Sequence, residues 1–419
     1  MNSEQLGLTM IMVLNIVSFG KSLKLMNASL ITIEEMENFH LIDEDFSPND
    51  EYIFLGQCRN MGFTEVTPHY QCDIVLRRLP ISESSKPIRK CNIQLTENSM
   101  LVDIPISKIR LQHLNEDVVI LKWDDQTSGN IYTNLLVVSM TDCSTKSLQF
   151  FNDISSNVIT SNILISKDSF EVLTADKELC FTKTCKIGYD REGNRKYIQY
   201  FPLSLNNVFI TPMEDTQGNR NFFVLGFKDA GYDLDFISKS NDKINLATFQ
   251  RPKFHHIPVS KTNQKYGLCF TFLSSDNRIK CIQYDASVDM KMDSLIEVER
   301  NYSLLGTYNL ADNAMLVVIS DCMKKSFQTF KCNNLLIAKL KIDDYKPNLS
   351  RFYSIALNEF TCNFDDGLTK VDIAENDEDI CFYVICSHKI ANDDENLAVH
   401  SSFLRSACTQ KMLIPHFFE

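Results

Sequence analysis

A short apolar segment recurs seven times along the chain, and this repeat constrains the fold more than any other feature. Each copy has eight residues, is rich in Val, Ile, Leu and Phe, and follows a short polar turn. Successive copies start 43 to 66 residues apart. The octets are EYIFLGQC (51–58), DVVILKWD (117–124), ELCFTKTC (178–185), NFFVLGFK (221–228), GLCFTFLS (267–274), MLVVISDC (315–322) and DICFYVIC (379–386). Such runs are too short for helices, so each octet is predicted to be a strand buried on both faces.

Further strand-like segments flank every octet. A short apolar segment precedes each one, as SFEVL (169–173) precedes the third, and a more alternating segment follows it, such as KYIQYF (196–201). Four-stranded units repeated at this spacing are typical of β-propellers. We therefore predict an all-β fold, a seven-bladed β-propeller with four-stranded antiparallel blades, forming a single domain over residues 28–419. One of the apolar end segments, SLITIEE (29–35) or KMLIPHFFE (411–419), is expected to complete a blade and remove a sheet edge.

The cysteines fall in phase with the repeat. Of 14 cysteines, four occupy the eighth octet position (Cys58, Cys185, Cys322 and Cys386) and three occupy the third (Cys180, Cys269 and Cys381). Directly opposed residues on antiparallel strands lie within disulfide range. The predicted bridges are Cys58–Cys72, Cys269–Cys281, Cys322–Cys332 and Cys386–Cys408. The alternative is that these are buried free thiols.

The first residues have the pattern of a secretory leader. Residues 6–19 form an apolar run of signal-peptide length, and Ser18 and Gly20 supply small residues before a cleavage point at Lys21. We predict a signal peptide over residues 1–20, although MNSEQ lacks the usual basic residue; the alternative is a buried element of the fold. Three glycosylation sequons occur, at Asn27, Asn301 and Asn348. Together with the cysteines, they favour a secreted, extracellular glycoprotein.

Charge and missing motifs exclude several functions. The net charge of −12 argues against a nucleic-acid partner or an anionic membrane surface, and no apolar run reaches the roughly 18 residues of a membrane span. The sequence contains no G-x-S-x-G, H-E-x-x-H, G-x-G-x-x-G or Walker motif. No catalytic, cofactor-binding or metal-binding residue is therefore predicted. The adjacent His255 and His256, the acidic turn 377–379 and the basic residues between 77 and 90 are interpreted as ordinary strand and surface positions.

The repeat resembles seven-bladed β-propellers in architecture, and among secreted propellers it is similar to sema domains in blade count and disulfide use. The resemblance supplies no functional residues. It favours a monomeric, non-enzymatic secreted protein that binds an extracellular protein or small ligand through its rim loops or channel face. The richness in Asn, Lys, Ile and Ser, with the leader and the sequons, also resembles secreted salivary or venom effectors of invertebrates. The long segments after the first, second and sixth octets are the expected binding loops. Two alternatives stay open: a secreted hydrolase or lyase, and an intracellular WD-repeat-like scaffold with reduced cysteines.

Overall fold

The computed structural model describes 26 stretches of the chain between residues 40 and 410. They are residues 40–46, 51–64, 67–79, 86–95, 109–127, 130–153, 162–166, 168–176, 178–180, 184–201, 209–214, 220–228, 231–250, 252–253, 265–272, 278–285, 287–297, 303–310, 314–320, 323–324, 330–331, 334–340, 353–356, 367–375, 378–390 and 399–410. The predicted signal peptide (1–20) and both end segments lie outside them.

Within these stretches the strands form seven antiparallel sheets. The first contains β1 (His40–Phe46), β2 (Tyr52–Thr64), β3 (Thr67–Arg78) and β4 (Arg89–Leu95), and the second β5 (Arg110–Asn115), β6 (Val118–Thr127), β7 (Asn130–Ser139) and β8 (Thr145–Asp153). The third contains β9 (Asn162–Ser166), β10 (Ser169–Thr174), β11 (Cys185–Asp190) and β12 (Arg195–Tyr200). The fourth contains β13 (Phe209–Glu214), β14 (Arg220–Lys228), β15 (Gly231–Ile237) and β16 (Lys243–Gln250).

The remaining sheets follow the same plan with one exception. The fifth contains β17 (Pro252–Lys253), β18 (Lys265–Phe272), β19 (Arg278–Asp285) and β20 (Met290–Glu297), and the sixth β21 (Ser303–Asn309), β22 (Met315–Ser320), β25 (Asn334–Leu340) and β26 (Tyr353–Ala356). The seventh has five strands, β23 (Met323–Lys324), β24 (Phe330–Lys331), β27 (Gly367–Glu375), β28 (Asp379–Ile390) and β29 (Val399–Gln410). Strands β23 and β24 come from the segment that follows the sixth octet, and they extend the next sheet by pairing Phe330 with Leu368.

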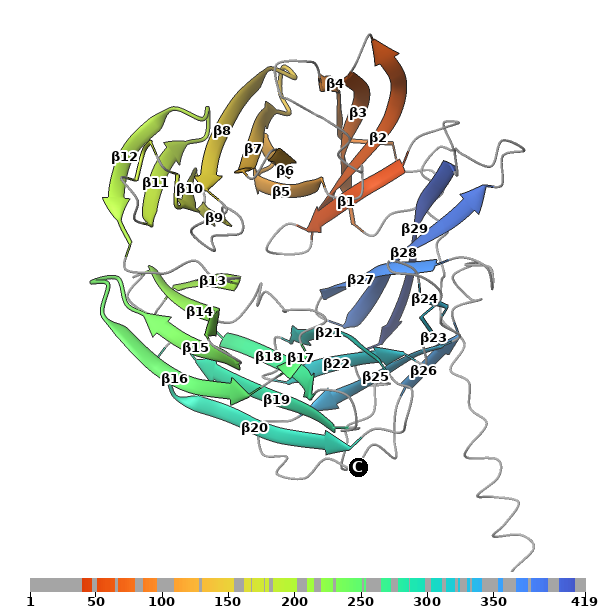
Figure 1. The fold of residues 1–419 in the computed structure, drawn as a ribbon. Helices are drawn as coiled ribbons and strands as arrows, with labels where there is room; N and C mark the ends of the chain where they lie inside the picture. Colours follow the sequence, from red (N-terminus) through yellow and green to blue (C-terminus); the bar gives the residue numbers. More distant parts are fainter. Residues whose placement is uncertain are drawn as a thin grey trace, which may run out of the picture.

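The sheets follow one another around a common centre, with first strands such as β1, β5 and β13 nearest to it and fourth strands such as β12, β16 and β20 outermost (Figure 1). This arrangement is a β-propeller, as the repeat predicts. Six octets overlap the expected buried strands, which are β2, β6, β14, β18, β22 and β28.

The third octet is the exception, and its predicted strand is wrong. Its first residues, Glu178 to Cys180, lie in a turn, and the second strand of this sheet is β10, which the sequence suggested as the first. The turn forms because the Asp176 carboxylate accepts the backbone N–H groups of Glu178 and Leu179 at 3.0 and 2.8 Å. A disulfide between Cys180 and Cys185 then closes it. The in-phase placement of these two cysteines is therefore a coincidence of spacing.

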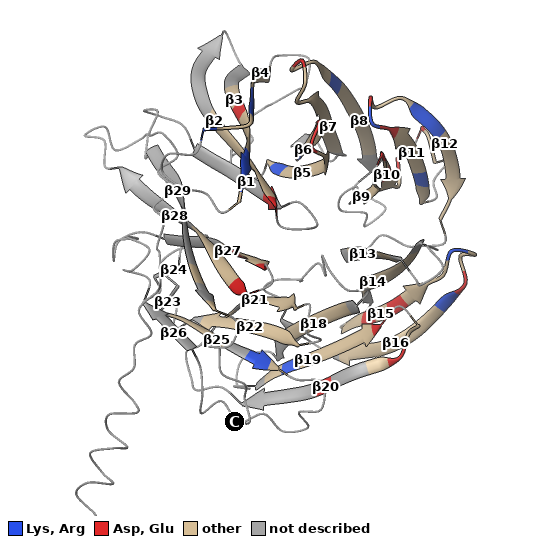
Figure 2. Ribbon diagram, turned by 180° about the vertical axis from the view of Figure 1, so that it is seen from behind, with Lys and Arg blue, Asp and Glu red and all other residues tan. Residues whose placement is uncertain are grey.

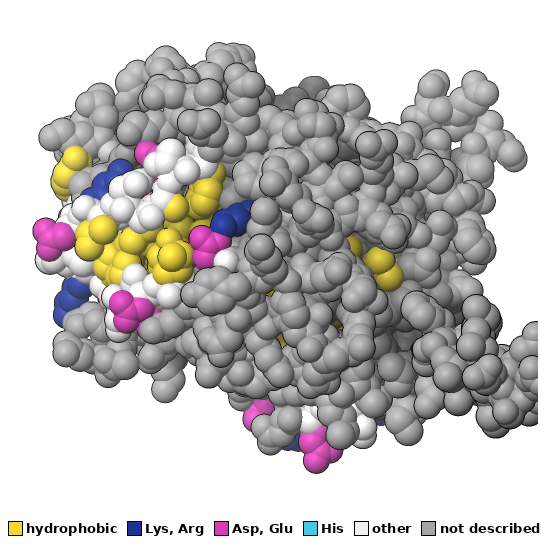
Figure 3. All heavy atoms as spheres, turned by 90° about the horizontal axis from the view of Figure 1, so that it is seen from below, with side chains coloured by type: hydrophobic (Ala, Val, Ile, Leu, Met, Phe, Trp, Pro, Cys, Tyr) yellow, Lys and Arg dark blue, Asp and Glu magenta, His cyan; other side chains and the backbone are white. Residues whose placement is uncertain are grey.

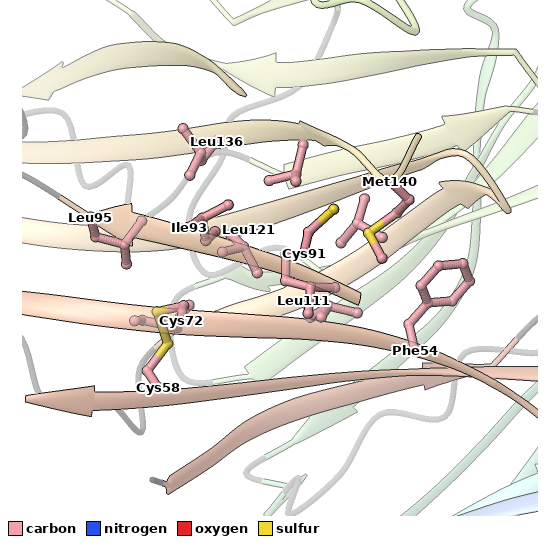
Figure 4. Packing of buried hydrophobic residues seen from close by; sticks show 14 of the residues in the cluster. Phe54, Cys58, Cys72, Cys91, Ile93, Leu95, Leu111, Leu121, Leu136 and Met140 are labelled. Atoms are coloured by element: carbon pink, nitrogen blue, oxygen red, sulfur yellow. A yellow bond between two sulfur atoms is a disulfide. The ribbon is translucent and has the colours of Figure 1, made fainter. Parts of the chain in front are cut away.

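The core lies between neighbouring sheets, which explains why the octets are apolar on both faces. In β6, Val119 and Leu121 pack in the cluster shared with the first sheet, while Val118 and Ile120 pack in the cluster shared with the third. Figure 4 shows the first of these clusters, with side chains from both sheets interleaved. Burial of this kind contributes roughly 25 cal/mol per Å² of apolar surface.

Packing also joins the first and last sheets. Ile53 and Leu55 of β2 lie in one cluster with Ala374, Cys381 and Tyr383 of the seventh sheet. Within the described residues, neither of these two sheets contains a strand from the other's part of the chain. The end segments expected to complete a blade lie outside those residues.

Candidate functional site

Disulfides link directly opposed strands in three sheets. Cys58 bonds to Cys72 and Cys269 to Cys281, the pairs expected from the sequence, and in both cases the two cysteines are register partners. Their Cα atoms are 4.1 and 4.2 Å apart. Cys322 and Cys332, a third expected pair, lie outside the described residues.

The predicted Cys386–Cys408 bridge is wrong. Cys408 bonds to Cys381, its direct register partner, at a Cα separation of 4.0 Å. Cys386 is instead opposite Phe403. The reason is hairpin length: β28 continues to Ile390 before the chain turns back, so the register places the third octet position, not the eighth, opposite Cys408.

A further disulfide, which the sequence analysis missed, joins two neighbouring sheets. Cys91 on β4, the outermost strand of the first sheet, bonds to Cys143 in the turn between β7 and β8 of the second. Arg89 adds a charge-assisted hydrogen bond to Asp117, in the turn between β5 and β6 of the second sheet. The outer edge of the first sheet is thus fastened to its neighbour covalently and by charge.

The inner strands of the same two sheets are joined by an aspartate–histidine pair. One oxygen of Asp45 on β1 accepts the backbone N–H of His113 on β5 at 2.9 Å and lies 2.6 Å from its Nδ1. The His113 ring stacks on Phe54, with centroids 5.1 Å apart. A histidine held at Nδ1 by a carboxylate has a fixed ring orientation, with Nε2 directed away from the carboxylate. Sequence reasoning missed the pair because its members are 68 residues apart.

The first and fourth sheets each contain a polar triad around a buried aspartate. Asp73 of the first sheet, almost fully buried, accepts a hydrogen bond from Asn92 at 2.7 Å and pairs with Lys90 at 2.9 Å. In the fourth sheet, Asp235 is bound in the same way by Asn245 at 3.1 Å and Lys243 at 2.8 Å. The signal that could have revealed the triads is Lys-x-Asn at the start of the outermost strand, with an aspartate on the strand before it.

The third sheet has a different polar group, which fixes a tyrosine on its outermost strand. Glu171, Gly188 and Tyr197 are register partners across β10, β11 and β12. The Tyr197 hydroxyl donates to the Glu171 carboxylate, which Lys186 also approaches at 3.3 Å. The tyrosine ring can cross β11 only because residue 188 is glycine: a Cβ there would lie 2.3 Å from Cε1 of Tyr197.

The turn before β12 is highly polar and closed by hydrogen bonds. Gly193 has a φ of +75°, a conformation that glycine adopts freely, and Asn194 donates to Asp190 through its backbone N–H at 2.7 Å. Lys196 pairs with Asp190 at 2.8 Å. Burial acts to raise the pKa of Asp190, but the bonds from Lys196 and Asn194 prevail and lower it to about 2.

Strand β12 itself is exposed along its whole length. All six residues from Arg195 to Tyr200 are exposed, and Tyr197, Ile198 and Tyr200 have exposed fractions of 43, 43 and 56%. The other exposed large apolar side chains among the described residues lie elsewhere, at Ile88, Ile244 and Met290. Figure 3 shows apolar side chains gathered near the outer strands of the fourth and fifth sheets, where half-buried residues such as Leu246 and Val288 add to Ile244 and Met290. Strand β12 is therefore the densest run of exposed apolar side chains in the described chain.

The other sequence-predicted sites are only partly covered by the structure. The sequons at Asn27, Asn301 and Asn348, and the pair His255–His256, lie outside the described residues. The long segments expected to bind ligands are described only in part. In the basic stretch, Arg89 and Lys90 are engaged with Asp117 and Asp73. The described part of the chain contains no group of three potential metal ligands. It also contains no helix of the length and apolar character needed to cross a membrane.

Comparisons with known proteins bear on the fold alone. No protein-family model matches the sequence, and no curated protein matches it. In structure, the chain is similar to the β-propeller domain of the Trilobed protease from Pyrococcus furiosus, with a TM-score of 0.47 and 10% identity over 88% of this chain and 93% of that one. It is also similar to a complex of KlAtg21 with the coiled-coil of AgAtg16, with a TM-score of 0.45, 9% identity and coverage of 88% and 98%. Prolyl oligopeptidase B from Galerina marginata has a TM-score of 0.44 and 9% identity over 84% of this chain and 47% of its own.

Proposed function

We propose that the chain is a secreted, non-enzymatic β-propeller that binds an extracellular protein or small ligand through its rim loops or channel face. The observation that carries the proposal is the set of five disulfides among the described residues, three linking opposed strands and one fastening two sheets together. Such bonds persist in oxidising compartments and are rare in the cytosol. The proposal includes the finer architecture: each of the seven sheets is one blade, so the ring has seven.

The test is secretion of the full chain from a eukaryotic cell under its own N-terminus. The intact mass and free-thiol content of the protein in the medium are then measured. The proposal expects loss of residues 1–20 and few free thiols. Protein retained in the cell, with Met1 intact and all 14 cysteines reactive, would instead support the intracellular scaffold.

A secreted hydrolase or lyase is the second candidate, and only the Asp45–His113 pair favours it. A carboxylate-oriented histidine is the usual arrangement of a general base. Under the non-enzymatic proposal, His113→Gln changes the stability of the inner junction and abolishes no reaction. A hydrolytic activity of the wild type that disappears in this variant, while the variant stays folded, would establish the enzyme instead.

A further inference from the structure

We propose that the outer edge of β12 is a docking site for an extended, acidic segment of a partner protein, which adds to the third sheet as a further strand. The inference rests on the proposed function, because it assumes a binding protein, but it places the partner on the outer rim rather than at the rim loops or channel.

The first argument is the edge itself. Among the described residues, β12 pairs only with β11, and it forms the outer end of the order β12-β11-β10-β9. Figures 1 and 2 both show it at the periphery of the ring. An exposed strand edge is a template for pairing with another chain, and strand addition is a common mode of peptide recognition.

The second argument is the side chains that flank the edge. Ile198 and Tyr200 are register partners of Ile187 and Cys185, which belong to the core between the second and third sheets, so they point toward the second sheet. Tyr197 points to the opposite face, but its ring extends inward over β11, away from the outer edge. An added strand would therefore find its apolar contacts on the face of Ile198 and Tyr200, and alternate side chains of an extended peptide could use them.

The third argument is pre-organisation. The ring of Tyr197 extends inward over Gly188 of β11, and its hydroxyl is held by the buried Glu171 of β10. This contact ties β12 to the sheet without occupying its outer edge. Little further ordering of the strand is therefore needed when a partner pairs with it.

The fourth argument is charge. Strand β12 carries Arg195 and Lys196 and no carboxylate, in a chain whose net charge is −12. Beside it, Asp190 and Glu192 pair with Lys196 and Arg191, and Asp117 and Asp168 also lie near Arg191. The positive charge on the strand itself favours an acidic segment and disfavours a basic one.

The test uses the full secreted chain and two fluorescent octapeptides, one alternating Glu and Val and one alternating Lys and Val. Fluorescence polarisation is expected to show the Glu-Val peptide binding at least about ten-fold more tightly than the Lys-Val peptide. Ile198→Glu, and separately Tyr200→Ser, should weaken that binding by about ten-fold or more. Ile244→Glu on β16 is the matched control, because Ile244 is at least as exposed as Ile198, at 51% against 43%, and it should change binding less than about two-fold.

Several outcomes would overturn the inference. They are no binding of the Glu-Val peptide by the wild type, equal binding of both peptides, or unchanged binding by folded Ile198→Glu and Tyr200→Ser variants. Light scattering that shows a dimer lost in Ile198→Glu would assign the edge to a second copy of this chain instead. None of these results alters the secretion and thiol measurements, so the proposed function stands or fails separately.

Discussion

Strands β4 and β12 hold the same position, the outer edge of a sheet, and begin with similar sequences, RKCNIQL and RKYIQY. Yet β4 buries Cys91, Ile93 and Leu95 on one face and is fastened to the second sheet by a disulfide, whereas every residue of β12 is exposed. The contrast shows that an outer strand of this propeller can serve the fold or be left available for binding. The role of an outer strand depends on whether the neighbouring sheet covers its apolar face.

The largest expected effect comes from removing the fastening of β4. Replacing Cys91 and Cys143 together by Ala should lower the free energy of unfolding by about 4 kcal/mol in the chain-entropy model, because the disulfide closes a long loop. Replacing Cys180 and Cys185 should cost only about 2 kcal/mol, because that loop is short. Guanidinium unfolding followed by circular dichroism measures both. Equal losses would contradict a special role for the inter-sheet bond.

Truncating one isoleucine on each strand compares their packing directly. Ile93→Ala on β4 should cost about 2–4 kcal/mol, because a buried side chain leaves a cavity. Ile198→Ala on β12 should change stability by no more than about 0.5 kcal/mol, because its side chain is already largely in water. The same unfolding experiment applies. A similar cost at both positions would mean that β12 is covered in solution.

The tyrosine crossing on β12 gives a smaller effect. Gly188→Ala should cost about 1–3 kcal/mol, because the new Cβ forces the Tyr197 ring from its place over β11. In a Tyr197→Ala background the same substitution should cost little. A double-mutant cycle built from unfolding free energies measures the coupling. An undiminished cost in that background would show that the glycine is needed for another reason.

Acid should affect the turns beside both strands alike, and this is the smallest expected effect. Hydrogen bonds from Ser139 and Ser144 lower the pKa of Asp142, beside Cys143, to about 2, and the pKa of Asp190 is also about 2. Because both values lie below the ordinary 3.8, each carboxylate stabilises the fold above about pH 4, and this contribution is lost as the pH falls toward 2. Asp142→Asn and Asp190→Asn should each flatten that loss in unfolding experiments between pH 5 and 2. If only one of the two variants flattens the loss of stability, the two turns do not respond to acid alike, and the expectation is contradicted.

The sequence predicts the repeat and the propeller because buried strands need continuous apolar runs, and this requirement is local. The Cys58–Cys72 pair follows from register across a short hairpin. The strand predicted for the third octet is wrong because hydrogen bonds to the Asp176 carboxylate form a turn within an apolar stretch. The Cys91–Cys143 bond and the Asp45–His113 pair join different sheets, so no local pattern encodes them. The exposure of β12 is also not predictable from the sequence. The alternation in KYIQYF predicts one buried face, but it carries no information on whether a neighbouring sheet covers that face.

Hydrogen exchange of the full chain, read by mass spectrometry, tests the contrast between β4 and β12 most directly. The account predicts slow exchange in β4, fast exchange in β12, and slower exchange in β12 alone when the Glu-Val octapeptide is added. Exchange in free β12 as slow as in β4, or unchanged by the peptide, would contradict the assignment of this edge to partner binding.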